Sequence, residues 1–263
     1  MIRPVKKFFL WAVVAVLLSI WGCARYPGVV ERPKPLSNEE WVARLKDRAE
    51  YWQTYQATLH LRADSAKGKY PLRAVILANL PGQFRLEAFN LWGQTLGVLI
   101  LNNDQSTLWV PNERTIYTAQ KPGVLTDHFL GVSLPLDILG YSLAACLPPA
   151  ELKTFKMVAG SSKWIGMSRG IENGWSYQWE FLSQPMALKA FEAREGLWHY
   201  SVTYEPSVPL DVKGSPQRVK FLSSEWQMDI TLDQIQVTSN LQSDLFLPVF
   251  PGETRKVNLD ASK

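Results

Sequence analysis

Histidine, cysteine and acidic side chains do most of the catalysis and metal binding in proteins, and this chain uses them sparingly. Its three histidines, His60, His128 and His199, are far apart in the sequence. The motifs of zinc sites, nucleophilic serines, phosphate loops and dinucleotide loops do not occur. Asp229 and Asp233 share one face of a strand-like run, where a solvated face explains them better than a catalytic pair. We therefore expect a protein that is not an enzyme and that holds no metal.

Cysteine chemistry is indicated at Cys23, which directly follows a predicted N-terminal signal peptide. Residues 1–22 carry three basic residues and then an apolar run shorter than the roughly 20 residues that span a bilayer. The ending Ile20-Trp21-Gly22-Cys23 resembles a bacterial lipobox. This resemblance implies diacylglycerol on the sulfur, cleavage after Gly22 and an N-acyl chain on the new amino group. An ordinary signal peptide with a chance cysteine, and an uncleaved anchor, are the alternatives.

The lipobox bears on location and charge. Ala24 follows Cys23, and a residue other than aspartate at this place favours the outer membrane, with the protein facing the periplasm. Removing the three basic residues of the signal lowers the formal net charge from +4 to +1, so we expect no binding to nucleic acid. Cys146 is then the remaining cysteine, which predicts no internal disulfide, and its apolar neighbours predict a buried thiol.

The mature chain begins with a tether and a helix. Residues 23–36 contain three prolines and no periodic pattern, which is typical of an extended linker. Ser37 and Glu40 have the spacing of a capping box, which marks a helix start. An apolar stripe at intervals of three and four residues then predicts an amphipathic helix with a charged opposite face. The stripe is Trp41, Leu45, Ala49 and Trp52, and the charged face is Arg44, Lys46, Asp47 and Arg48.

Most of the remaining chain alternates with the two-residue period of half-buried strands. The first run is 55–64, in which every second residue is apolar. Short turn sequences separate it from the next runs, which indicates antiparallel pairing. The further strand-like runs are 72–80, 83–89, 95–102, 106–111, 114–119, 175–182, 198–204, 218–222 and 226–237.

Residues 37–263 are therefore predicted to form one mainly β domain. We expect a strongly curved antiparallel sheet of about ten or eleven strands, an incomplete, half-open barrel, with a closed barrel as the alternative. The segment from Pro135 to Cys146 breaks the alternation and predicts an apolar helix, so that a few helices cover the concave face. The chain has 11 Trp, 11 Phe and 9 Tyr, and an inner face rich in them either forms a plain core or holds an acyl chain.

The order of these features resembles the LolA/LolB lipoprotein-localisation family, and the outer-membrane receptor branch, LolB, is the nearest match. The likeness rests on the lipobox, the tether, the capped helix, the antiparallel strands, the segment SLPLDILGYSL and the tail DLFLPVFPGET. It extends as an architecture from Ser37 to the end of the chain. The segment from Trp164 to Tyr204 is less easily matched.

The turn Asn90-Leu91-Trp92-Gly93 is the most specific part of this likeness. LolB carries a protruding leucine in this turn that is needed to insert lipoproteins into the membrane. Asn90 and Gly93 match the family pattern, Trp92 stands where the protruding leucine stands, and Leu91 replaces a proline. The resemblance implies that Leu91 and Trp92 form a wedge against membrane or cargo, and tryptophan suits a membrane interface. The alternative is a turn that buries Trp92 against the body.

The resemblance also implies an acyl-chain cavity with a movable lid, although the same residues could simply be core. We expect one group of these residues in the middle segment and another on a strand. They are Leu134, Leu136, Ile138, Leu139 and Leu143, followed by Trp175, Tyr177, Trp179 and Phe181.

The implied function is to accept acylated lipoproteins from a LolA-like periplasmic carrier and insert them into the periplasmic leaflet of the outer membrane. The protein would act as a monomer, without a cofactor beyond the lipid on Cys23. Burial of acyl chains, at about 0.8 kcal/mol per CH₂, would drive the transfer. The competing hypotheses are a structural or assembly lipoprotein that uses the fold as a docking module, and a lipid-processing enzyme, for which the sequence offers no triad.

Overall fold

The computed structural model describes most of the chain after the tether. The described residues are 36–103, 105–120, 123–158, 163–169, 175–183, 185–196, 198–210, 213–247, 249–250 and 252–260. Residues 37–263 form one compact unit. The predicted signal peptide, Cys23 and most of the tether lie outside the described residues. No helix within the described ranges is long and apolar enough to cross a membrane.

The described residues form a single curved sheet of 14 strands that is open at both edges. Neighbouring strands pair antiparallel, except for a parallel pair at one edge, β14 with β6. The predicted fold class, a mainly β, curved and incomplete barrel, is thereby confirmed. In spatial order the strands are β14 (Arg255–Asn258), β6 (Thr115–Ala119), β5 (Gln105–Val110), β4 (Thr95–Asn102), β3 (Gln83–Phe89), β2 (Gly68–Asn79), β1 (Thr54–Ser65), β13 (Trp226–Val237), β12 (Arg218–Ser223), β11 (Trp198–Pro209), β10 (Met186–Glu195), β9 (Ser176–Ser183), β8 (Lys163–Arg169) and β7 (Lys156–Val158).

The sheet has more strands than the sequence indicated. Four were missed, namely β7, β8, β10 and β14. Two of them, β7 and β14, are short edge strands of three and four residues, too short to show an alternation. The other two carry charged or small residues at many positions, so their pattern is weak.

Helix α2 (Asn38–Tyr51) begins at the predicted capping box. The Ser37 backbone donates to Glu40 Oε2 at 2.7 Å, and the Glu40 backbone donates to Ser37 Oγ at 3.2 Å. Trp41 and Leu45 are buried, as the apolar stripe predicted. The prediction was wrong for Arg48, which lies inside the protein and is only 5% exposed.

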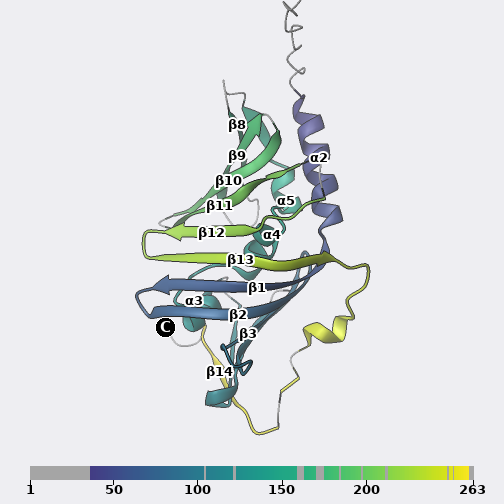
Figure 1. The fold of residues 1–263 in the computed structure, drawn as a ribbon. Helices are drawn as coiled ribbons and strands as arrows, with labels where there is room; N and C mark the ends of the chain where they lie inside the picture. Colours follow the sequence, from purple (N-terminus) through teal and green to yellow (C-terminus); the bar gives the residue numbers. More distant parts are fainter. Residues whose placement is uncertain are drawn as a thin grey trace, which may run out of the picture. The chain divides into compact units, whose positions relative to one another are not determined.

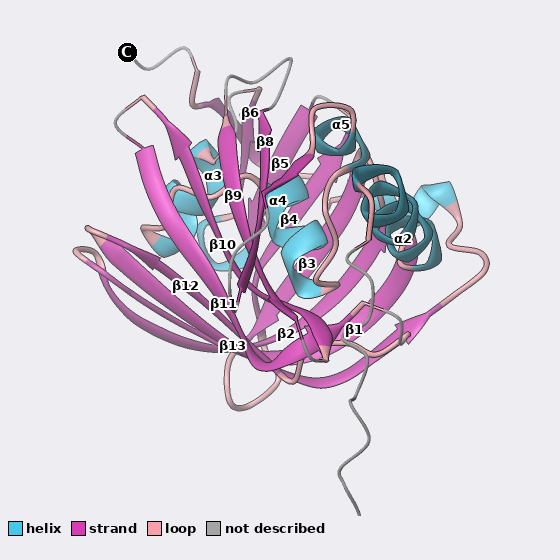
Figure 2. Cartoon of the chain, turned by 90° about the horizontal axis from the view of Figure 1, so that it is seen from above, coloured by secondary structure: helices cyan, strands magenta, loops and turns pink. Residues whose placement is uncertain are grey.

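Helices α3 (Val124–Leu130), α4 (Leu136–Leu143) and α5 (Pro149–Leu152) lie on the concave side of the sheet, and Figure 2 shows the strands curling around α3 and α4. Close contact requires glycine at two places. A Cβ on Gly97 of β4 would lie 2.8 Å from the ring of Phe129 in α3, and one on Gly140 of α4 would lie 3.0 Å from Leu80. Helix α4 is shorter than predicted, because Pro135 is its N-cap and it ends before Cys146.

The chain after β13 returns across the outer face of the sheet (Figure 1). The described part of the chain contains two short 3₁₀ turns, η1 (Pro111–Glu113) and η2 (Ser243–Phe246). Phe246 is fully buried, and the ring of Phe250 packs at a tilt on Trp109 with ring centroids 5.7 Å apart. The outward-facing Val98 and Ile100 of β4 are buried as a result. The tail therefore gives this part of the sheet a second apolar layer.

Candidate functional site

The turn between β3 and β4 is held by the side chain of Asn90. Its Oδ1 accepts hydrogen bonds from the backbone amides of Trp92, at 2.9 Å, and Gln94, at 3.0 Å. The Asn90 backbone amide also donates to the Gln94 carbonyl at 3.0 Å, and Gly93 takes a positive φ of 80° that favours glycine. The turn is therefore a preformed tip and not a loose loop.

The two apolar residues of this tip point into solvent. Leu91 is 73% exposed and Trp92 is 85% exposed. The turn does not fold back onto the body, which was the alternative considered for Trp92. A tryptophan this exposed loses the benefit of burying its large ring, so its place at a rigid tip calls for a partner outside the chain.

The nine predicted cavity and lid residues all lie in the core. All nine side chains are buried, namely Leu134, Leu136, Ile138, Leu139 and Leu143 in the segment around α4, and Trp175, Tyr177, Trp179 and Phe181 on β9 and its approach. These nine residues therefore line no open cavity in this conformation. The described residues form hollows of about 150 Å³, beside β1 and β13, and about 200 Å³, beside α2. Neither hollow is lined by these nine residues.

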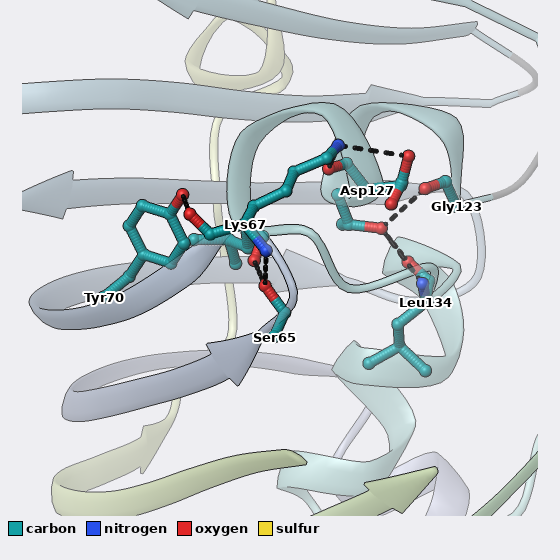
Figure 3. Close-up of polar contacts among 8 residues, drawn as sticks. Ser65, Lys67, Tyr70, Gly123, Asp127 and Leu134 are labelled. Carbon is teal, nitrogen blue, oxygen red and sulfur yellow. Dashed lines mark hydrogen bonds and ion pairs between the residues drawn. The ribbon is translucent and has the colours of Figure 1, made fainter. Parts of the chain in front are cut away.

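Helix α3 is fastened to the hairpin between β1 and β2 by polar contacts (Figure 3). Lys67 Nζ donates to the Asp127 carbonyl at 2.6 Å and to its carboxylate at 3.3 Å. Ser65 Oγ donates to the Leu130 carbonyl at 3.2 Å. Gly131 has a φ of 68° and approaches Ser65 too closely for any Cβ. These contacts hold α3 at the protein surface, where an ion pair contributes little to stability.

Helix α4 is fastened from inside the protein. The Tyr55 hydroxyl, whose pKa is raised by burial so that it keeps its proton, donates to the Gly140 carbonyl at 2.6 Å. Arg48 donates from Nε to the Ala145 carbonyl at 2.8 Å, and from Nη2 to the carbonyls of Ala144, at 2.7 Å, and Gly214, at 2.9 Å. The bonds to Ala144 and Ala145 satisfy backbone carbonyls just after the end of α4, where no helical partner exists.

The thiol and the histidines do not form a reactive centre in the part of the chain that the structure describes. Cys146 is buried, and burial raises the pKa of its thiol to about 12, so it is not a nucleophile near neutral pH. His60 lies 3.1 Å from Asp233, and His199 lies 3.6 Å from Glu192, both on exposed side chains. No group of three or more candidate metal ligands occurs among the described residues.

Sequence reasoning missed one feature of the concave face. Tyr200 and Tyr204 of β11 are buried with Tyr141 and Ser142 of α4, so hydroxyl groups lie within an otherwise apolar layer. Tyrosine counts as apolar in a strand pattern, and this hides its hydroxyl from a periodicity argument. The spacing of Tyr200 and Tyr204, four residues apart on one face of a strand, was the available signal.

No family model and no curated protein matches this sequence. Solved structures do resemble it. A LolA superfamily protein from Nitrosomonas europaea has a TM-score of 0.53 at 9% identity, over 81% of this chain and 99% of that one. A putative outer membrane lipoprotein-sorting protein domain from Vibrio parahaemolyticus has a TM-score of 0.52 at 10% identity, over 80% and 97% of the two chains.

A third structure extends the same comparison. A DUF1329 family protein from Desulfovibrio piger has a TM-score of 0.56 at 7% identity, over 80% of this chain and 95% of that one. At these identities the likeness concerns the fold alone. The protein therefore has a LolA-like fold, while nothing in these comparisons distinguishes LolB from other proteins with that fold.

Proposed function

We propose that this protein is an outer-membrane lipoprotein that accepts acylated lipoproteins from a LolA-like periplasmic carrier and inserts them into the membrane. The observation that carries the proposal is the rigid tip on which Leu91 and Trp92 stand 73% and 85% exposed. The LolA-like fold supports a role in binding acyl chains, because such proteins include a lipoprotein-sorting domain. The protein makes and breaks no covalent bond in this role.

The tip would act by entering the interfacial layer of the membrane. Trp92 can place its ring among the acyl chains while its indole N–H stays near the head groups, and Leu91 adds apolar area beside it. The hydrogen bonds from Asn90 mean that little conformational freedom is lost on insertion. The anchor on Cys23 would keep the tip close to the bilayer, and Ala24 favours the outer membrane.

Cargo uptake at the predicted cavity residues requires the helices over them to move, because all nine of these residues are buried. Helices α3 and α4 would have to shift so that acyl chains replace their side chains against the sheet, where α3 packs on β5 and β6 and α4 packs on β3. Replacing the apolar contacts of the helices by apolar contacts of the acyl chains changes the free energy of the protein little. The acyl chains meanwhile leave water or a carrier site that binds them more weakly, and this favours transfer. Transfer then runs forward by differential burial and needs no nucleotide.

A transfer assay tests the proposal. Liposomes bearing the full chain are mixed with a labelled lipoprotein held by its periplasmic carrier, and the label entering the bilayer is measured. Wild type should drive insertion. Trp92→Glu should slow insertion at least tenfold and leave cargo on the protein. Leu222→Glu is the matched control, because Leu222 is 56% exposed on β12, and it should behave as wild type.

A second function is favoured by one observation, the burial of all nine predicted cavity and lid residues. A structural or assembly lipoprotein could use the same fold as a docking module without any cavity, and the exposed tip would then contact a protein partner. The transfer assay separates the two. If wild type takes up no cargo while the carrier delivers it to an authentic receptor, the acceptor function is wrong and the docking module remains.

A further inference from the structure

The concave face contains a cluster of buried hydroxyl groups between α4 and β11. Tyr200 and Tyr204 lie on the inner face of β11 and are 2% and 4% exposed. Tyr141 and Ser142 of α4 are buried as well. Ser142 lies near Tyr204, and Tyr141 lies near Cys146, which is itself a neighbour of Tyr204. Burial raises the pKa of the Tyr204 phenol, and the nearby Ser142 hydroxyl lowers it. We call these four residues the hydroxyl cluster.

The hydroxyl cluster is not satisfied by the protein. Within the described ranges, no hydrogen-bond partner lies in reach of any of its four hydroxyl oxygens. The same holds for Oε2 of Glu151 on α5, a residue that is 2% exposed. Ser142 lies close enough to Tyr204 to lower the pKa of its phenol, but the two hydroxyls do not meet the geometry of a hydrogen bond. Buried polar atoms are nearly always paired in native proteins, so a group of unpaired ones points to an outside partner.

The surroundings of the hydroxyl cluster favour an uncharged partner. Burial raises the pKa of Glu151 to about 7, and it also raises the pKa of Asp137. Burial raises the pKa of the Tyr200 phenol, and the nearby Tyr177, both carboxyls and Tyr204 raise it further. Arg48 lies near Tyr204, but its Nε and Nη2 already donate to backbone carbonyls. The site thus offers neutral hydroxyl groups that can donate and accept, and the two neighbouring carboxyls disfavour an anionic ligand.

Aromatic rings border the hydroxyl cluster on the sheet. Tyr200 lies 5.4 Å from Trp175 and 6.3 Å from Phe191 and Trp226, measured between ring centroids. A ligand at this place would therefore have an apolar portion against these rings and a small polar portion at the hydroxyls. An acyl chain joined to glycerol by an ester has this division.

We propose that the hydroxyl cluster binds the uncharged ester and glycerol oxygens that link acyl chains to their head. The proposal deepens the proposed function and rests on its premise that the concave face takes up acyl chains. Ester carbonyls accept hydrogen bonds from Tyr200 and Tyr204, and the chains replace apolar side chains of α4. The same diacylglyceryl chemistry occurs in an acylated cysteine of a lipoprotein and in free diacylglycerol, and the test separates these sources.

Native mass spectrometry of the full chain released from detergent tests the proposal. The probes are a triacylated cysteinyl peptide, dipalmitoylglycerol, its ether-linked analogue without carbonyls, and dipalmitoylphosphatidylglycerol. The variant is Tyr200→Phe with Tyr204→Phe, which keeps both rings. Tyr70→Phe is the control, because the Tyr70 hydroxyl lies outside the cluster and donates to the Lys67 carbonyl.

We expect the double variant to bind the ester probes at least tenfold more weakly and the ether analogue as wild type does, while Tyr70→Phe binds all probes as wild type. If wild type binds the acylated peptide but not dipalmitoylglycerol, the site is specific for lipoproteins. If wild type binds both probes, the site also takes up free diacylglycerol. Equal ester binding by wild type and the double variant overturns the inference and leaves the proposed function standing. Preference for the anionic lipid also overturns it. If wild type binds no acylated probe, both fail.

A second readout covers the case in which the variant is simply less stable. Removing hydroxyls that have no partner in the protein should leave the melting temperature unchanged or raise it. A lower melting temperature with unchanged ester binding would mean that the hydroxyls serve the fold, and this too overturns the inference.

Discussion

Asn90 Oδ1 accepts a hydrogen bond from the Trp92 backbone amide at 2.9 Å, so the side chain of Asn90 fixes the backbone position of Trp92. We predict that Asn90→Ala lowers the free energy of unfolding by about 1 kcal/mol and slows transfer, because the tip loses this bond and that of Gln94. Urea unfolding and the transfer assay measure the two effects. Asn90→Asp keeps the acceptor oxygen and should restore most of both. Equal behaviour of the two variants would contradict this account of the tip.

The hydrogen bond from Tyr55 to Gly140 links the central strand to α4. We predict that Tyr55→Phe lowers the free energy of unfolding by about 1–2 kcal/mol, because it leaves a buried carbonyl without its donor. Hydrogen exchange in α4 should become faster. Tyr70→Phe removes a more exposed hydroxyl bond and should change the stability by less than about 0.5 kcal/mol. Unchanged exchange in α4 would show that this bond does not hold the helix.

Gly166 of β8 is required by the ring of Phe155. An added Cβ would lie 2.5 Å from Cζ of that ring, and Phe155 is buried, so the ring has little room to move. We predict that Gly166→Ala lowers the free energy of unfolding by about 1–3 kcal/mol, the usual cost of overpacking. Gly252→Ala is the control, because nothing lies within 4 Å of its added Cβ. Chemical denaturation of both variants checks this, and a neutral Gly166→Ala would contradict it.

Glu151 makes stability depend on pH. Burial raises the pKa of its carboxyl from 4.5 to about 7. The native state therefore holds this proton more tightly than the unfolded chain, and its contribution to stability is complete below pH 4.5 and is lost as the pH rises to 7. Because Glu151→Gln stays neutral, it should match wild type near pH 4.5 and be more stable by about 1–3 kcal/mol at pH 8. Melting curves across this range measure the difference, and a constant difference would contradict the prediction.

The local features of the fold could be predicted because neighbouring residues determine them. Tyr55, Ala57, Leu59 and Leu61 alternate in sequence and are buried along β1, while the residues between them are exposed. The capping box of Ser37 and Glu40 depends on two residues three apart. The sequence also indicated Leu91 and Trp92 as a tip, and the structure places both in solvent. Their role as a wedge stays a prediction.

Other features depend on contacts between distant parts of the chain. Strand β14 pairs with β6 across about 140 residues, and a four-residue strand carries no sign of its partner. Arg48 lies on a helix like its charged neighbours, and only the carbonyls of Ala144 and Ala145 explain its burial. Whether Leu136 and Leu139 are lid or core likewise depended on how closely α4 approaches the sheet, which Gly140 allows.

The central claim is that the tip enters the bilayer, and the depth of residue 92 tests it most directly. The Trp92→Cys variant is labelled with an environment-sensitive fluorophore in liposomes that contain nitroxide-labelled lipid. Cys146 can stay, because burial raises its pKa to about 12 and slows its labelling. Leu222→Cys provides the matched exposed site. We predict strong quenching and a blue shift at position 92 and neither at 222, whereas equal, unquenched emission at both positions would contradict the claim.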